Sequence, residues 1–288
     1  MDCISDETRL TALIGSPVRQ SLSPKIHNTA FAKMGLNYLY LSFDVKGHEL
    51  TGTVEAMKKL NFRGFNVTMP HKQEIIEDLD DISQEAKLIG AVNTVVNEGG
   101  RLIGYNTDGR GYSQSLRAEG VSIKDKSFAI AGAGGAARSI AIQLALEGAK
   151  EIILLNRTME SGQRLGQIIS NSIANVKVKV KPLQEEYIRL AINRADVLIN
   201  STPLGMEGMK DRSIIDGIDL LDPNLVVSDL IYNPSETKLL KEARAKGCKS
   251  LNGLGMLLGQ AAIAFELWTG QSMPVGHIRE TIKSSGGI

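Results

Sequence analysis

The sequence is poor in the residues that build disulfide scaffolds and metal sites. It contains two cysteines, Cys3 and Cys248, which lie far apart without a CxxC spacing, and only four histidines among 288 residues. A disulfide framework and a structural zinc site are therefore not expected, and we predict no bound metal.

Long apolar runs and an excess of either charge are also missing. No stretch reaches the roughly 18 apolar residues of a transmembrane helix, and the start, MDCISDETRL, lacks the basic and apolar regions of a secretory signal. The 33 basic and 32 acidic side chains leave a net charge of +1, so the sequence lacks the excess of basic residues that is typical of proteins that bind nucleic acid or a membrane surface. These absences predict a reduced, soluble, cytoplasmic protein that binds neither nucleic acid nor membranes.

Apolar runs of strand length alternate with helical patterns along nearly the whole chain. The runs are ALIG (12–15), YLYLSF (38–43), GFNVT (64–68), AVNTVV (91–96), FAIAG (128–132), EIILLN (151–156), VKVKV (176–180), DVLIN (196–200) and LVVSDL (225–230). Strands that alternate with helices predict an α/β fold with parallel sheets covered on both faces. The length favours two domains.

Two glycine-containing segments suggest where these domains meet. YNTDGRG (105–111) contains no apolar run, and LNGLG (251–255) precedes the apolar helix MLLGQAAIAFELW. We expect an N-terminal α/β substrate domain over residues 1–107 and a dinucleotide-binding domain over residues 108–252. The helices of residues 253–288 should return to complete the first domain, because they are too apolar to stand free.

The segment from Ser127 to Thr158 has the pattern of a dinucleotide-binding unit. Three glycines follow the strand FAIA and open the helix AARSIAIQLALEG, in the spacing G-x-G-G-x-A with Ala137 in the third position. The turn lets backbone approach a pyrophosphate, and the helix N-terminus supplies N–H donors. Because strand, helix and second strand follow in order, a Rossmann-type NAD(P) domain is favoured over a glycine turn that merely closes a βα unit. The expected contacts are Gly132, Ala133, Gly134, Gly135 and Ala136.

The end of the second strand bears on the choice of cofactor. NAD enzymes usually carry an acid here for the ribose hydroxyl, whereas this strand ends in Asn156, Arg157 and Thr158. A guanidinium and a hydroxyl suit a 2′-phosphate, which favours NADP. Glu160 lies close behind and could bind a free ribose, so NAD remains open, as does a surface arginine without this role.

The segment QSLSPKIHNTAFAKMG of the first domain contains a candidate binding site for a small carboxylate. Ser23 before Pro24 predicts a helix start with Ser23 as N-cap, and Gly35 predicts its end. Ser21 and Ser23 then place two hydroxyls beside a helix N-terminus, where an anion is favoured. That Ser23 only caps the helix remains an alternative.

A second polar element is GFNVTMPHKQEIIEDL. We expect its strand to end at Pro70, which starts a helix with Ile75, Ile76 and Leu79 facing inward. Lys72 would lie in the first helical turn, where the macrodipole disfavours its charged form, as an acid–base lysine requires. An exposed lysine that merely tolerates this position is the alternative.

Three further polar residues occupy positions that packing alone does not explain. Asn93 is predicted inside a strand, where asparagine is depleted. Asp108 is predicted just before a helix, where it would act as N-cap, and Gln260 as a buried amide among apolar neighbours. Together with the serines, a threonine and the lysine, they suit a small polyhydroxylated acid as ligand.

Seven motifs in this order resemble the shikimate dehydrogenase family, and they span essentially the whole chain. They are SLSP (21–24), NVTMPHK (66–72), GAVNT (90–94), NTDG (106–109), GAGGAA (132–137), NRT (156–158) and NGLGMLLGQAA (252–262). The resemblance implies a reversible, NADP-dependent reduction of 3-dehydroshikimate to shikimate, a step toward chorismate and the aromatic amino acids. The alternative is the quinate/shikimate dehydrogenase branch, which uses NAD as well, and a monomer or a homodimer is expected.

The resemblance also implies residue roles at matching positions. Ser21 and Ser23 would hold the substrate carboxylate, and Lys72 and Asp108 would form the catalytic pair. The residues expected to bind substrate hydroxyls are Thr68, Asn93 and Gln260, and those expected to line the nicotinamide and substrate pocket are Leu230, Tyr232 and Gly253.

One departure concerns the 2′-phosphate. Members selective for NADP follow NRT with a further basic residue about three positions on, whereas here Ser161 follows Glu160. This leaves dual use of NAD and NADP, and turnover of quinate, possible. A nucleotide sensor without turnover is the rival from another class, and the presence of Lys72 and Asp108 speaks against it.

Overall fold

The computed structural model describes residues 4–284, so Cys3 lies outside the described residues. The chain divides into two compact units, one formed by residues up to Thr107 together with those from Leu258 onward, and one formed by Asp108–Leu257. The two units describe how the chain packs. The functional roles of the predicted domains, residues 1–107 with 253–288 for the substrate and residues 108–252 for the dinucleotide, remain a prediction. Within residues 4–284, no helix is both long and apolar enough to span a membrane.

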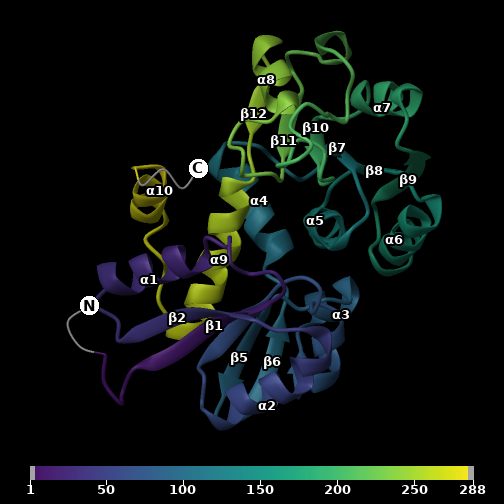
Figure 1. Ribbon diagram of the computed structural model, residues 1–288. Coiled ribbons are helices and arrows are strands. Elements are labelled where there is room, and N and C mark those ends of the chain that lie inside the picture. The colour runs from purple at the N-terminus through teal and green to yellow at the C-terminus, as the bar shows by residue number, and fades with distance from the viewer. Residues whose placement is uncertain (1–3, 285–288) are drawn as a thin grey trace. The chain divides into compact units, whose positions relative to one another are not determined.

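The first unit is built around a mixed sheet (Figure 1). Its elements are β1 (Arg9–Gly15), α1 (Ser23–Lys33), β2 (Tyr38–Asp44), η1 (Gly47–Glu49), α2 (Leu50–Lys59), β3 (Gly64–Val67), η2 (Glu74–Asp78), β4 (Asp81–Ile82), α3 (Gln84–Ile89), β5 (Thr94–Glu98), β6 (Arg101–Tyr105), the later part of α9 (Leu254–Thr269) and α10 (Val275–Ser284). In the described part of the chain, six strands pair in the order β2-β1-β3-β5-β6-β4.

The expectation of parallel strands is wrong for part of this sheet. β5 runs antiparallel to both β3 and β6. For β5 and β6 the reason is the turn Gly99–Gly100 between them, where both residues have positive φ, 63° and 93°. A two-residue turn of this kind joins antiparallel strands directly, whereas a parallel connection needs a crossover.

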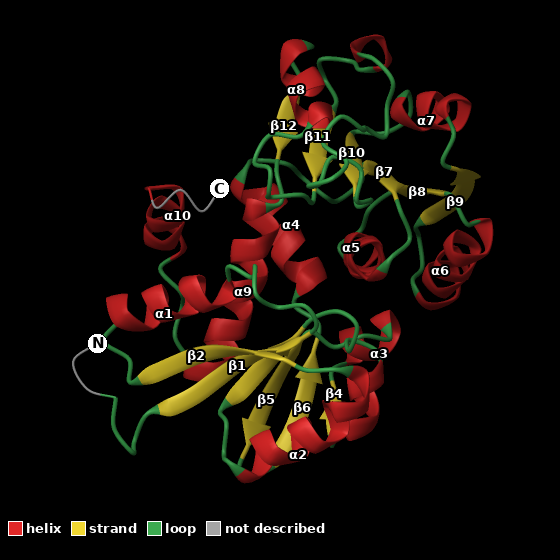
Figure 2. Ribbon diagram, viewed as in Figure 1, coloured by secondary structure: helices red, strands yellow, loops and turns green. Residues whose placement is uncertain are grey.

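The two faces of this sheet pack against different helices (Figure 2). On one face Ala12, Ile14 and Phe65 meet Val54 and Met57 of α2. The other face carries an aromatic cluster, defined here as His27 and Phe31 of α1, Tyr38 and Tyr40 of β2, and Phe265 and Trp268 of α9.

The second unit contains a wholly parallel sheet. Its elements are α4 (Asp108–Ala118), β7 (Ser127–Ala131), α5 (Gly135–Leu146), β8 (Glu151–Asn156), α6 (Met159–Ser172), β9 (Lys177–Pro182), α7 (Glu185–Ile192), β10 (Val197–Asn200), η3 (Ile218–Leu220), β11 (Val226–Asp229), α8 (Lys238–Ala245), β12 (Lys249–Leu251) and the start of α9. The strands pair in the order β12-β11-β10-β7-β8-β9, which is the order of a dinucleotide-binding sheet. The predicted two-domain α/β class is confirmed.

Helices cover both faces of this sheet. α7 and α8 pack on one face through Ile188, Ile192, Leu239 and Leu240, and α5 and α6 lie on the other (Figure 2). The strand order reverses between β7 and β10. In open α/β sheets a ligand binds outside the carboxyl ends of the strands at such a point.

Candidate functional site

The glycine turn after β7 has the geometry that a pyrophosphate requires. Gly132 has φ +110°, and a Cβ there would collide with the Ser201 hydroxyl, which is itself held by a 2.6 Å hydrogen bond to the Ala131 carbonyl. Gly134 is the N-cap of α5, and a Cβ on Gly134 or Gly135 would meet nothing within 4 Å. The backbone is therefore open to a ligand at the N-terminus of a 12-residue helix.

The end of β8 presents polar groups to solvent. Arg157 and Thr158 are exposed, and the Asn156 amide fixes the turn by donating to the Thr158 carbonyl at 2.7 Å. Glu160 faces Arg164 one turn further along α6, with 3.3 Å between Glu160 Oε1 and Arg164 Nη1. Arg164 lies six residues beyond NRT, outside the position at which a second basic residue was expected. The i, i+4 spacing of acid and base was the available signal.

A buried carboxylate organises the ends of β10 and β11. Asp229 is fully buried and accepts hydrogen bonds from the Thr237 hydroxyl at 2.7 Å, the Asn200 amide at 3.1 Å and the Ile231 N–H at 3.1 Å. Burial raises the pKa of Asp229, while these three donors oppose the rise. The network fixes the turn that carries Leu230, and sequence reasoning missed it because its members are distant in the chain.

Leu230 and Gly253, both predicted cofactor contacts, are neighbours in this unit. The Gly253 N–H donates to the Ile231 carbonyl at 3.0 Å, and a Cβ on Gly253 would overlap the Leu230 carbonyl. Only glycine lets the two segments approach so closely. Tyr232 follows Ile231 in the chain and is half-buried. Burial raises the pKa of its hydroxyl.

In the first unit, the prediction that Ser23 caps α1 is wrong. The N-cap is Leu22, which already has helical angles (φ −80°, ψ −9°) and whose side chain makes no capping bond. The Ser23 N–H donates instead to the Ser21 hydroxyl at 3.2 Å. The Ser23 hydroxyl is therefore not used for capping, and Ser23 is buried, with 7% of its surface exposed. Gly35 does end the helix, with φ 64°.

The predicted helix from Pro70 is also wrong at Lys72. Residues 69–73 form turns, and a 3₁₀ helix follows only at Glu74. The cause is tertiary: the Lys72 carbonyl accepts from the Val92 N–H at 2.7 Å, which removes it from any helical ladder. The helix-dipole argument for Lys72 therefore no longer applies, although Ile75 is buried as expected.

Asn93 lies one residue before β5 rather than inside a strand. It is 3% exposed, and its backbone bonds the Val67 N–H at 2.9 Å and the Tyr105 carbonyl at 3.0 Å. Its side-chain oxygen accepts from the Thr107 N–H at 2.8 Å, and its amide donates to the Thr107 hydroxyl at 3.0 Å. The strand expectation failed because the side chain takes over part of the local backbone bonding.

The remaining predicted residues are distributed over both units. Thr68 is half-buried, with its N–H bonded to the Ile14 carbonyl at 2.9 Å. Asp108 is buried and is the first residue of α4 rather than the residue before it. Gln260 lies on α9 and is half-buried rather than buried. Asp108 belongs to the second unit, whereas Thr68, Lys72 and Gln260 belong to the first.

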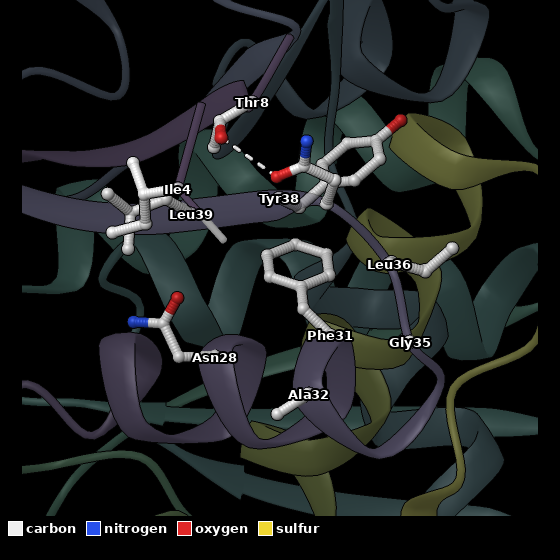
Figure 3. Close-up of a pocket in the computed structure, with 10 residues that line it drawn as sticks. Ile4, Thr8, Asn28, Phe31, Ala32, Gly35, Leu36, Tyr38 and Leu39 are labelled. Carbon is white, nitrogen blue, oxygen red and sulfur yellow. Dashed lines mark hydrogen bonds between the residues drawn. The ribbon is translucent and has the colours of Figure 1, made fainter. Parts of the chain in front are cut away.

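A pocket of about 280 Å³ beside the edge strand β2 is distinct from these residues (Figure 3). Its lining includes Ile4, Phe31, Leu36 and Leu39, and none of the predicted substrate residues is among its lining residues. Asn28 of α1 closes one side of it. The pocket is therefore no part of the predicted substrate site.

Three family models match successive parts of the chain. The shikimate dehydrogenase substrate binding domain matches residues 13–95, the shikimate/quinate 5-dehydrogenase model matches residues 115–214, and the shikimate 5′-dehydrogenase C-terminal domain matches residues 253–283. Together they cover most of both units.

Similar proteins agree over almost the full length. A shikimate dehydrogenase (NADP⁺) of Alkaliphilus oremlandii is 58% identical over 279 residues, which cover 97% of this chain and 98% of that protein. The crystal structure of the Listeria monocytogenes shikimate 5-dehydrogenase with shikimate and NAD is 43% identical, with a TM-score of 0.94 and coverage of 98% and 99%. The Thermus thermophilus enzyme with NADP(H) and shikimate is 35% identical, with a TM-score of 0.86 and coverage of 96% and 99%. The chain therefore belongs to the shikimate dehydrogenase family.

Proposed function

We propose that this protein is an oxidoreductase that reversibly reduces 3-dehydroshikimate to shikimate with NADPH. The observation that carries the proposal is 58% identity, over 97% of the chain, to a relative named shikimate dehydrogenase (NADP⁺). The residues that the family motifs specify for acid–base chemistry and for carboxylate binding are all present as Lys72, Asp108, Ser21 and Ser23.

The second unit fits a dinucleotide. The open backbone at Gly134 and Gly135 would hold the pyrophosphate, and Arg157 and Thr158 would hold the 2′-phosphate. NADP⁺ bound there would supply the acceptor for the hydride that leaves the carbon bearing the substrate's 3-hydroxyl. Because Arg157 is exposed, we expect a preference for NADP over NAD of about one to two decades.

Polar residues of both units bind the substrate and transfer the proton. Ser21 and Ser23 bind the substrate carboxylate, and Thr68, Asn93 and Gln260 bind its hydroxyls. Tyr232 lines the pocket of the nicotinamide and the substrate. Lys72 takes the proton of the 3-hydroxyl during oxidation and returns it during reduction, and Asp108 orients Lys72. A cytoplasmic location, a monomeric or homodimeric state, and turnover of quinate stay predictions.

Steady-state kinetics over four combinations, shikimate or quinate with NADP⁺ or NAD⁺, test the proposal. We expect the highest kcat/KM for shikimate with NADP⁺. A higher value for quinate with NAD⁺ would favour the quinate/shikimate branch, and no turnover in any combination, with NADP⁺ still bound in a titration, would favour a nucleotide sensor.

A further inference from the structure

One buried peptide group links the backbone at Lys72 to the segment that precedes Asp108. It is the peptide bond between Ala91 and Val92, which lies after α3 and before β5. Its N–H, on Val92, donates to the Lys72 carbonyl at 2.7 Å. Its carbonyl, on Ala91, accepts from Asn106 Nδ2 at 3.0 Å, and Asn106 lies two residues before Asp108 in the chain. The two hydrogen bonds therefore use the opposite ends of a single peptide group.

This peptide group is rigid and shielded from water. A trans peptide bond is planar, so its N–H and its carbonyl point in opposite directions and keep a fixed relation to each other. Val92 is 0% exposed, and Ala91 and Asn106 are each 4% exposed, so water does not readily replace a lost partner here. A shift on one side of the peptide group is therefore felt on the other.

The chain on either side of the peptide group is anchored as well. Before it, α3 ends at Gly90, which has φ 66° and whose N–H donates to the Ala86 carbonyl at 2.8 Å. After it, the Asn93 N–H donates to the Tyr105 carbonyl at 3.0 Å. The position of the peptide group is thus set by its own neighbours, and the Asn106 side chain binds to a fixed acceptor.

We propose that Asn106 is a positioning residue for the acid–base pair: its side-chain amide fixes the segment that leads to Asp108 to the peptide group that also fixes Lys72. This inference rests on the proposed function, in which Lys72 moves the proton and Asp108 orients Lys72. Asn106 needs no contact with the substrate. It acts by holding together two main-chain segments that are far apart in the sequence.

Removal of the Asn106 amide leaves the Ala91 carbonyl without this donor and allows the residues just before Asp108 to shift. Thr107 keeps its hydrogen bonds to the Asn93 side chain, so we expect a small displacement of the segment rather than its detachment. A displacement of about 1 Å in a catalytic group can cost about 100-fold in rate. Because the residues proposed to bind the substrate carboxylate and hydroxyls are unaltered, the loss should appear in kcat rather than in KM.

Asn106→Ala tests the inference, with Asn97→Ala as matched control. Asn97 is also buried, 5% exposed, and also bonds to the main chain, since its Oδ1 accepts from the Gly100 N–H at 2.8 Å. It lies on β5 next to the turn that leads to β6. Asn106→Ala should lower kcat about 10- to 100-fold, with KM for shikimate and for NADP⁺ within about threefold of wild type. Asn97→Ala should leave kcat within about twofold, and a similarly small change in Asn106→Ala would overturn the inference.

A Lys72→Ala background separates positioning from a general loss of structure. Without the lysine there is no pair left to align, so Asn106→Ala should lower the remaining kcat by less than about twofold. A merely structural role would lower kcat by the same factor in both backgrounds, and that result would contradict the inference.

Asn106→Ser is the second variant, which keeps the test open if Asn106→Ala does not fold. Its hydroxyl leaves a polar group in the vacated space, but the side chain is shorter than that of asparagine, so kcat should again fall at least about tenfold. Wild type without shikimate turnover would refute the proposed function itself. An active wild type with a normal kcat in the folded Asn106 variants would refute the role of Asn106 alone.

Discussion

Gly64 of β3 lies directly beneath Trp268, and this contact gives the sharpest prediction for stability. A Cβ at Gly64 would lie 2.6 Å from Trp268 Cδ1 and closer still to Trp268 Nε1 and the Val95 carbonyl oxygen. Those last two atoms form a buried 3.0 Å hydrogen bond. Gly64→Ala therefore inserts a methyl group into the one place where the indole and the strand meet.

The backbone that carries the indole is also held in place. The Trp268 carbonyl accepts from Arg63 Nε at 2.8 Å and from the Tyr38 hydroxyl at 3.1 Å. Overpacking a core costs about 1–3 kcal/mol, and a buried donor and acceptor that lose each other cost about 1–3 kcal/mol more. We expect Gly64→Ala to lower the free energy of unfolding by about 2–6 kcal/mol.

Urea unfolding followed by tryptophan fluorescence measures this loss. Trp268 is the only tryptophan in the sequence, so the signal reports on the first unit. Gly52→Ala is the control, because Gly52 is exposed on α2 and a Cβ there meets nothing within 4 Å. It should stabilise by roughly 0.5–1 kcal/mol through helix propensity. A loss below about 1 kcal/mol for Gly64→Ala would refute the packing argument.

Three further predictions concern acid stability, catalysis and cofactor choice. Burial lowers the pKa of His27 from 6.5 to about 3, so the unfolded state alone gains this proton as the pH falls below 6.5; stability should fall toward pH 3 by up to about 1.4 kcal/mol per unit from this group. His27→Phe should remove that slope from the urea midpoints between pH 6.5 and 4.5, and an unchanged slope would contradict the assignment. Lys72→Ala should lower kcat at least about 100-fold with KM for shikimate within a few-fold, whereas a normal kcat with a raised KM would make Lys72 a binding residue only. Arg157→Ala should raise KM for NADP⁺ by about tenfold and leave that for NAD⁺ nearly unchanged; equal losses would show that Arg157 does not read the 2′-phosphate.

The parallel sheet was predictable because its four central strands, β11, β10, β7 and β8, are largely buried on both faces. Such strands appear as unbroken apolar runs, and EIILLN matches β8 (Glu151–Asn156) residue for residue. The mixed sheet was harder to predict from the sequence. β4 has only two residues, and β12 in the second unit only three, while the Gly99–Gly100 turn was a hairpin signal that the interpretation did not use.

The contacts within the candidate site could not be predicted from local sequence patterns. Motifs located the polar residues, but their surroundings depend on partners far away in the chain. The Val92 N–H takes the Lys72 carbonyl out of a helix, and Tyr40 bonds a residue 26 positions away. No periodicity or capping rule encodes such bonds, because they arise only once the sheet has brought β2, β3 and β5 together.

The path of α9 has a consequence for synthesis of the chain. The second unit is one continuous segment, Asp108–Leu257, whereas the first needs Phe265 and Trp268 from the end of the helix to complete its aromatic cluster. Domains fold as they leave the ribosome, normally in N-terminal to C-terminal order. Here the unit whose residues emerge first is completed last. The nascent first sheet must wait, with His27, Phe31 and Tyr40 uncovered on one face, while about 150 residues of its neighbour are made and folded.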